Sequence, residues 1–214
     1  MKTAPVIVLC AGGHSKVLVN ALLAMRAELI GLVDEDSQKH GASLLGVSVI
    51  GGHELVLTHD PGAVWLVNGL GSVDSLRRRK LLFERYKARG YRFLSVVHPA
   101  ATIGLEVDLG EGAQIMAGAV IQPGTIIGQD TIVNSRASID HDCCIGAHCH
   151  IAPGGVLSGT VHVGEEVHVG TGAVLINNIT VGNRALIAAG AIVIRDVPAE
   201  ARIAGSPGRV MRAK

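Results

Sequence analysis

The sequence predicts two domains of different class: a small mixed α/β domain over residues 1–96 and an all-β parallel β-helix over residues 97–214. Three observations predict this division. Strand-like and helix-like segments alternate in the N-terminal part, a branched aliphatic residue recurs every six positions from Ile103 to Val193, and every aromatic residue precedes position 94. A narrow three-sided helix has no room for large rings, so the loss of aromatic residues marks the boundary.

In the first domain, short apolar runs predict strands and apolar residues at helical spacing predict helices. Strands are expected at Val6–Leu9, Leu29–Val33, Val47–Ile50, Val64–Val67 and Phe93–Val97, and helices at Lys16–Arg26 and Asp74–Arg89. Alternation of the two element types indicates a parallel sheet with helices packed on it. We interpret the basic run of the second helix, residues 77–80, as a solvated helix face.

A glycine turn, Gly12-Gly13-His14, follows the first strand and opens the first helix. The free backbone N–H groups and the dipole of a helix N-terminus suit a phosphate. Asp34 ends the next strand about twenty residues further on, where an acidic side chain can bind a ribose hydroxyl. The arrangement is similar to a Rossmann dinucleotide-binding fold, although the G-x-G-x-x-G pattern is absent. The turn therefore indicates either a nucleotide site or a simple reversal of the chain.

The second domain is defined by its sixfold rhythm. Sixteen consecutive positions at this spacing are Ile, Val or Leu, and the residue two before each is small or β-branched. A period of six is neither helical nor a simple strand alternation. It fits coils of three short strands, with the aliphatic residue on the axis and coils stacked about 4.8 Å apart. We expect the tail, from Asp196, to cover the last coil and mask its open edge.

Composition excludes several classes of protein. The formal net charge of +1 argues against nucleic acid or an anionic membrane as the main partner. No apolar run is long enough to span a membrane, and the N-terminus lacks the layout of a signal peptide. Four cysteines, three of them bunched at positions 143, 144 and 149, do not resemble a secreted disulfide framework. A cytoplasmic enzyme is therefore expected.

A cluster of acidic, histidine and cysteine side chains spans residues 140–150 and invites a zinc interpretation. The repeat register argues against it. Cys143 and Cys149 fall on the small inward position, and His141 and His150 fall at different corners of the coil. We predict no metal site. The remaining histidines of this domain are interpreted as surface residues: His148, His162 and His168.

His141 is the candidate general base. It lies at an outward corner, and Gly159, one coil further on, leaves open space over the imidazole. Flanking carboxylates of Asp140 and Asp142 would stabilise the protonated ring and raise its basicity, which suits proton removal near neutral pH. A surface histidine without a role is the alternative.

Several motifs, in order along nearly the whole chain, resemble one family. They are Gly12 to Val17, Asp34-Glu35, His98-Pro99, Ile139 to Cys143, Ile145-Gly146, His150 and Gly205 to Val210. They resemble the bacterial sugar acetyltransferases that join a small nucleotide-binding domain to a hexapeptide-repeat domain. Members include N-acetyltransferases for bacillosamine and perosamine precursors and proteins named for sialic acid O-acetylation. These relatives form left-handed parallel β-helices and trimers, so the hand and the homotrimer are implied by the resemblance.

The resemblance implies an acetyl-CoA-dependent N-acetyltransferase whose acceptor is a nucleotide-linked amino sugar. His141 would be the general base and Asp142 the acid that supports it. Acetyl-CoA contacts are implied for His150, Gly159, Thr171 and Ala189. Nucleotide-sugar contacts are implied for Gly12, Gly13, His14, Asp34, Glu35 and Gly71. If His141 and His150 serve one site, that site lies between two chains, because they occupy different corners.

Three other functions remain open at this stage. The nearest is O-acetylation of sialic acid or another sugar, since a histidine base serves an amine or a hydroxyl. The second is a binding or scaffold protein whose catalytic site has decayed. The third is a nicotinamide oxidoreductase, which the first domain alone would suggest. A role in surface-polysaccharide or glycoprotein synthesis is implied only by the family.

Overall fold

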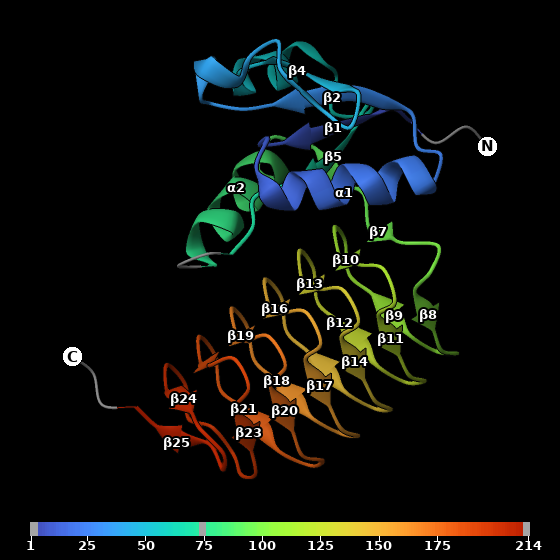
Figure 1. The fold of residues 1–214 in the computed structure, drawn as a ribbon. Helices are drawn as coiled ribbons and strands as arrows, with labels where there is room; N and C mark the ends of the chain where they lie inside the picture. Colours follow the sequence, from blue (N-terminus) through green and yellow to red (C-terminus); the bar gives the residue numbers. More distant parts are fainter. Residues whose placement is uncertain (1–3, 73–75, 212–214) are drawn as a thin grey trace. The chain divides into compact units, whose positions relative to one another are not determined.

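A computed structural model describes residues 4–72 and 76–211 of the chain. The chain divides into two compact units, residues 1–99 and residues 100–214 (Figure 1). Among the described residues there is no helix with the length and apolar character needed to cross a membrane.

The first unit is a mainly parallel sheet with helices. Its strands are β1 (Val6–Leu9), β2 (Leu29–Val33), β3 (Ser43–Leu44), β4 (Val47–Gly51), β5 (Trp65–Asn68) and β6 (Arg92–Phe93), and β7 (Val96–Val97) follows. The helices are α1 (Gly13–Ala24) and α2 (Arg77–Lys87), with 3-10 turns η1 (Ser37–Lys39) and η2 (His53–Thr58). The strand order is β3-β4-β2-β1-β5-β6, and only β3 and β4 pair antiparallel. The predicted α/β class is confirmed.

The centre of this sheet is the most buried part of the unit. All four residues of β1 are buried, and β1 lies between β2 and β5. The aromatic residues of α2 and β6 pack against the sheet, with the rings of Phe83 and Phe93 4.4 Å apart. Helix α1 begins at Gly13, earlier than predicted. The predicted start of the second helix, Asp74, lies outside the described residues.

The interpretation of residues 77–80 as a solvated face is wrong for Arg79, which is fully buried. Its guanidinium Nη1 donates to the carbonyl oxygens of Asn68, at 3.0 Å, and Leu70, at 2.8 Å. The Asn68 side chain donates back to the carbonyl of Arg79 at 3.1 Å. The guanidinium therefore donates to two backbone carbonyls, one on the last residue of β5 and one two residues further on. A run of basic residues in the sequence does not reveal this role.

The second unit is a stack of coils with three strands each (Figure 1). One sheet holds β10 (Gln114–Ile115), β13 (Ile132–Val133), β16 (His150–Ile151), β19 (His168–Val169), β22 (Leu186–Ile187), β24 (Arg202–Ala204) and β25 (Arg209–Val210). A second holds β8 (Thr102–Ile103), β11 (Val120–Ile121), β14 (Ser138–Ile139), β17 (Val156–Leu157), β20 (Val174–Leu175) and β23 (Ile192–Val193). A third holds β9 (Asp108–Leu109), β12 (Ile126–Ile127), β15 (Cys144–Ile145), β18 (His162–Val163) and β21 (Thr180–Val181).

The register of the coils follows the sequence period. From β8 to β20, each strand pairs in parallel with the strand eighteen residues on, so that Ile121 pairs with Ile139 and Ile139 with Leu157. These aliphatic side chains are almost completely buried, as are the small residues two positions before them, such as Ala137. The sixfold rhythm therefore fills the axis of a parallel β-helix, as predicted.

The tail extends the first of these three sheets. Strand β24 pairs in parallel with β22, and β25 then turns back and pairs antiparallel with β24. The chain from Asp196 thus supplies hydrogen-bonding partners to the last coil, which is how β-sheet proteins blunt an exposed edge.

Replacement of Arg79 by Met should lower the free energy of unfolding by about 2–3 kcal/mol, because buried carbonyl acceptors lose their donor. The matched control is Arg77→Met in the same helix, where the side chain is exposed; we expect a change below about 0.5 kcal/mol. Urea titration followed by circular dichroism measures both values. Equal stability of the two variants would contradict the structural role of Arg79.

Candidate active site

The His141–Asp142 pair lies at the corner that follows β14. The imidazole Nδ1 is 2.7 Å from Oδ2 of Asp142, and both side chains are more than half exposed. Because an ionised carboxylate only accepts hydrogen bonds, the Nδ1 atom is the donor. The Nε2 atom of the neutral ring then carries a lone pair and can accept a proton.

Two glycines on neighbouring coils make room for this pair. A Cβ atom at Gly159 would lie 2.6 Å from Nε2 of His141, and a Cβ atom at Gly124 would lie 2.6 Å from Oδ1 of Asp142. Real Cβ atoms do not approach so closely, so a side chain at either position would displace the pair. The space over Gly159, which was expected to be open, is taken up by the imidazole of His141 itself.

Hydrogen bonding sets the basicity of His141. The bond to Asp142 raises the pKa of the imidazole above its ordinary value, and the negative charge of Asp140 adds to the effect. Asp140 also accepts the backbone N–H of His141 at 2.8 Å, which fixes the turn. The site therefore holds an exposed base whose basicity is raised by an adjacent acid.

His150 lies on a different side of the coil, on β16, and is nearly buried. Its Nε2 atom is 3.0 Å from Nδ2 of Asn134, whose Oδ1 atom accepts the backbone N–H of Ser135 at 2.7 Å. The second contact fixes the orientation of the amide, so Asn134 donates and Nε2 of His150 accepts. The proton of a neutral His150 is then on Nδ1. Sequence analysis did not identify Asn134.

The remaining residues predicted to contact acetyl-CoA lie partly on the side of the β-helix that holds His150 and partly beside His141. Thr171 and Ala189 are exposed and lie in the turns after β19 and β22, strands of the same sheet as β16. Their turns stack, since the N–H of Gly190 donates to the carbonyl of Thr171 at 2.9 Å. Gly159 instead lies against His141. The structure thus brings His141, Asp142 and Gly159 together and leaves the others at a separate corner.

The zinc interpretation of residues 140–150 depended in part on two cysteines. Cys143 and Cys149 are buried, and burial raises the pKa of the Cys149 thiol to about 12. Within residues 4–72 and 76–211, no group of three or more His, Cys, Asp or Glu side chains is arranged to hold a metal ion.

The expectation that His148 lies on the surface is wrong. Its side chain is buried and its Nδ1 atom is 3.1 Å from Oδ2 of Asp130, which is also buried. The two residues are eighteen positions apart and occupy the same corner of successive coils, so they face each other. His168 is half-buried against the ring of His150, and burial lowers its pKa, whereas His162 is exposed.

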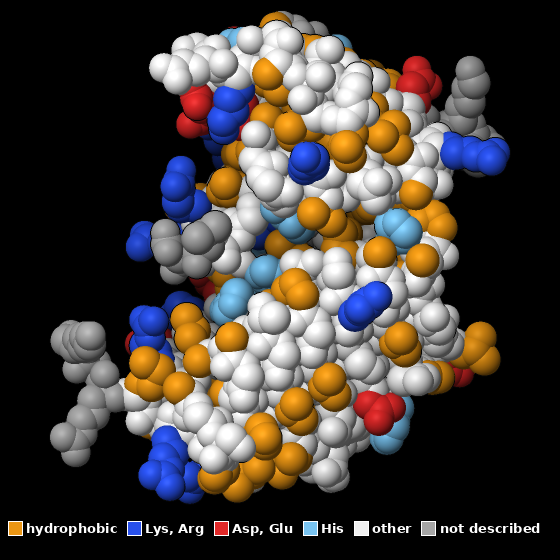
Figure 2. Space-filling view, in the orientation of Figure 1, with side chains coloured by type: hydrophobic (Ala, Val, Ile, Leu, Met, Phe, Trp, Pro, Cys, Tyr) orange, Lys and Arg blue, Asp and Glu red, His pale blue; other side chains and the backbone are white. Residues whose placement is uncertain are grey.

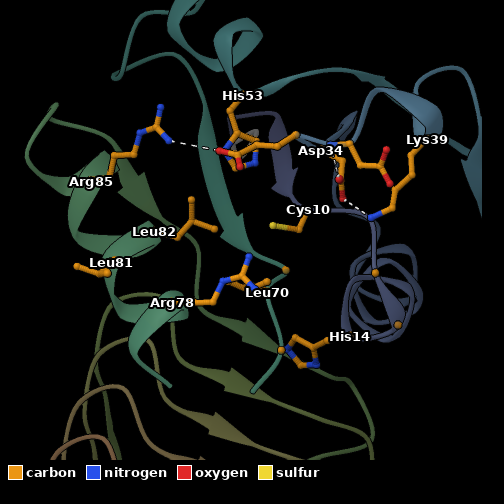
Figure 3. Close-up of a pocket in the computed structure, with 16 residues that line it drawn as sticks. Cys10, His14, Asp34, Lys39, His53, Leu70, Arg78, Leu81, Leu82 and Arg85 are labelled. Atoms are coloured by element: carbon orange, nitrogen blue, oxygen red, sulfur yellow. Dashed lines mark hydrogen bonds and ion pairs between the residues drawn. The ribbon is translucent and has the colours of Figure 1, made fainter. Parts of the chain in front are cut away.

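A cavity of about 740 Å³ opens in the first unit (Figure 3). Its volume falls in the usual range for small-molecule sites. Its lining includes all six residues implied for the nucleotide sugar: Gly12, Gly13, His14, Asp34, Glu35 and Gly71. The turn at Gly12 and Gly13 opens α1, whose N-cap makes no side-chain hydrogen bond, so the first N–H groups of the helix are suited to an anion.

Asp34 is a fixed carboxylate on one side of this cavity. Its Oδ2 atom accepts from the N–H of Ala11 at 2.7 Å and from Nζ of Lys39 at 3.0 Å, and Oδ1 accepts from the N–H of Asp36 at 2.9 Å. Burial alone would raise the pKa of Asp34, but these donors outweigh it and lower the pKa. A carboxylate has about four acceptor positions, so one remains for a ligand hydroxyl.

Comparison with known proteins supports one family. Residues 5–85 match the model of the PglD N-terminal domain. The H141N mutant of perosamine N-acetyltransferase from Caulobacter crescentus, solved with CoA and GDP-perosamine, is 32% identical over 98% of this chain and 97% of that chain, with a TM-score of 0.91. The acetyltransferase domain of PglB from Neisseria gonorrhoeae FA1090, solved with acetyl coenzyme A, is 34% identical over 97% of this chain and 99% of that chain, with a TM-score of 0.90.

The chain belongs to the hexapeptide-repeat sugar acetyltransferases. No curated protein sequence matches it significantly, so the assignment depends on the domain match and the solved structures. The predicted fold, a Rossmann-like domain and a left-handed parallel β-helix, is confirmed, and so is the predicted enzyme class.

Other cavity residues of this acetyltransferase were missed from the sequence. They are Cys10, Lys39, His53, Leu70, Arg78, Leu81, Leu82 and Arg85. Arg78 belongs to the basic run of α2, which had been interpreted as solvated, and only the pairing of strands brings α2 beside the glycine turn. Cys10 is not a nucleophile, since burial and the nearby charge of Asp34 raise its pKa to about 11.

The imidazole of His141 should titrate above 6.5, the ordinary value for histidine. Replacement of Asp142 by Asn should lower that pKa, because the carboxylate that stabilises the charged ring is lost. Asp140→Asn is the matched control and should lower it less, since Asp140 is not hydrogen-bonded to the imidazole and raises the pKa of the ring through its charge. NMR titration of the histidine ring protons measures all three, and equal pKa values in the wild type and Asp142→Asn would contradict the pairing.

Proposed function

We propose that this protein is an acetyl-CoA-dependent N-acetyltransferase that acts on the amino group of a nucleotide-linked amino sugar. The observation that carries the proposal is the exposed His141 imidazole, whose Nδ1 is held by Asp142 and whose ring fits against Gly159 because that residue has no side chain. The nucleotide-sized cavity of the first unit supports the acceptor class. The solved perosamine N-acetyltransferase, which holds CoA and GDP-perosamine, supports it further.

The reaction is a direct transfer in which His141 acts as the general base. The neutral amine of the acceptor attacks the thioester carbonyl of acetyl-CoA, a C–N bond forms, and Nε2 of His141 takes the amine proton. The C–S bond then breaks, and the leaving thiolate of CoA takes that proton from the imidazolium of His141, which returns to its neutral form. Asp142 keeps the proton of the neutral ring on Nδ1 and stabilises the imidazolium that forms. Much of the acceleration comes from holding the two reactants together.

A covalent acyl-enzyme is not required. Cys143 and Cys149 are buried, and burial raises the pKa of both thiols. Cys144 is exposed, but no base is hydrogen-bonded to its sulfur among the contacts of the described residues. A thiol nucleophile needs such an activating partner.

His150 is proposed to contact acetyl-CoA through its Nδ1–H. Asn134 donates to the Nε2 atom, so the proton of the neutral ring is on Nδ1 and a hydrogen bond from this side of the ring to an oxygen of the coenzyme is the contact we propose. Thr171 and Ala189, exposed in the following turns, extend the same side of the β-helix and would line the path of the coenzyme.

We also propose that the enzyme is a homotrimer in the cytoplasm with three sites at the subunit boundaries. His141 and His150 lie on different sides of one coil, so one chain does not join them in a single site. Apolar side chains on the outer face of the β14 sheet, Val156 and Ile192, are each 37% exposed, and Figure 2 shows hydrophobic side chains spread over this unit. A three-sided prism presents such faces naturally to a cyclic trimer.

The test is a thiol-release assay with acetyl-CoA against UDP-, GDP- and CMP-linked amino sugars, with free sialic acid as the O-acetyl acceptor. We expect turnover with an amino-sugar nucleotide, and His141→Asn should lower kcat by about 10²–10⁴-fold. In Asp142→Asn the acidic limb of the pH–rate profile should move to lower pH, because the raised pKa of His141 falls.

Gly159→Ala is a second variant, since it changes no ionisable group but forces the imidazole of His141 to move. It should reduce kcat while the protein remains folded. If only sialic acid is acetylated, the proposed N-acetyltransferase activity is wrong and the enzyme is an O-acetyltransferase. If the His141→Asn variant keeps the wild-type activity, His141 is not the general base.

A further inference from the structure

His53 differs from the other residues of the cavity in the first unit. Its ring is only 6% exposed, yet neither Nδ1 nor Nε2 has a hydrogen-bond partner among the described residues. Buried polar groups in folded proteins are almost always paired, because an unpaired one costs the full penalty of losing water. An unpaired histidine that lines a cavity is therefore a candidate for a ligand contact.

Two charged residues, Glu35 and Arg85, lie near His53 and line the same cavity. The Oε1 atom of Glu35 is 3.6 Å from Nδ1 of His53 and 3.6 Å from Nη1 of Arg85, distances too long for hydrogen bonds. Glu35 is 72% exposed, so its side chain is free to shift and uncover the imidazole. Leu81 and Leu82 of α2 provide apolar surface on the same cavity.

The order of groups along the cavity matches the order of groups in a nucleotide. Figure 3 shows His14 at one end and His53 at the other. The N-terminus of α1, beside His14, suits phosphate, and the free acceptor position of Asp34 suits a ribose hydroxyl. The heterocyclic base then falls at the end that holds His53, Glu35 and the leucines.

We propose that His53 hydrogen-bonds the heterocyclic base of the bound nucleotide and, with Glu35 and Arg85, determines which base is accepted. The inference rests on the proposed nucleotide-sugar acceptor. Burial lowers the pKa of His53, although the charge of Glu35 opposes this, so the ring is neutral at pH 7. A neutral imidazole offers one donor and one acceptor, which are the two kinds of group found along the edge of every base.

His53→Phe tests the proposal, because it removes both nitrogens and keeps a ring beside Tyr86, whose ring centroid is 6.1 Å from that of His53. The dissociation constants of UDP, GDP, CDP and ADP are measured by calorimetry for the full chain. The wild type should prefer one nucleotide. In the variant that dissociation constant should rise about tenfold, and the preference among the four should narrow. Thermal stability should be unchanged or higher, since an unpaired polar group is lost.

Arg78→Met is the matched control, because Arg78 lines the cavity on the His14 side and should affect all four nucleotides equally. His53→Leu serves as a second apolar variant if the Phe ring disturbs packing. Unchanged affinities in a folded apolar variant, or an equal loss for all four nucleotides, would overturn the base contact alone. A wild-type protein that binds none of the four would overturn the proposed acceptor class and this inference together.

Discussion

The structure depends on one constraint: every sixth residue must place a branched aliphatic side chain on the axis of the β-helix. The constraint fixes the register of each coil on the next, as Ile121, Ile139 and Leu157 show by pairing at intervals of eighteen. Because the register cannot slip without exposing these side chains, each corner position repeats at a fixed place. The proposed catalytic site depends on this regularity, since its side chains lie at a corner that the buried aliphatic core holds in place.

At the candidate site, glycines on the neighbouring coils leave room for two side chains. Gly124 and Gly159 are small where a side chain would collide with Asp142 and His141, so the acid–base pair fits between successive turns. At another corner the stacking of successive coils brings His148 against Asp130, and this pair is buried away from solvent. The two histidines therefore differ in chemistry, because His141 is exposed to solvent and His148 faces the neighbouring coil.

Much of this architecture could be predicted from the sequence, and the reasons differ by region. The β-helix has contacts that repeat at a constant interval, so a linear period specifies them, including the inward positions of Cys143 and Cys149. The first unit lacks such a period. Arg79 is buried because it donates to the carbonyls of Asn68 and Leu70 at the end of β5. His53 lines the cavity because of how η2 and α2 pack on the sheet. Asn134 was missed for a similar reason, because its partner His150 is sixteen residues away.

The central claim is that the fixed register separates His141 from His150 within one chain, so that each catalytic centre draws on two subunits. Mixing unfolded His141→Asn and His150→Asn chains in equal amounts and refolding them together tests it most directly. Neither variant alone should turn over substrate at more than a trace of the wild-type rate. In mixed trimers about a quarter of the subunit boundaries would hold both intact histidines. We therefore expect the mixture to recover about a quarter of the wild-type activity. A mixture that stays as inactive as its components would contradict the account.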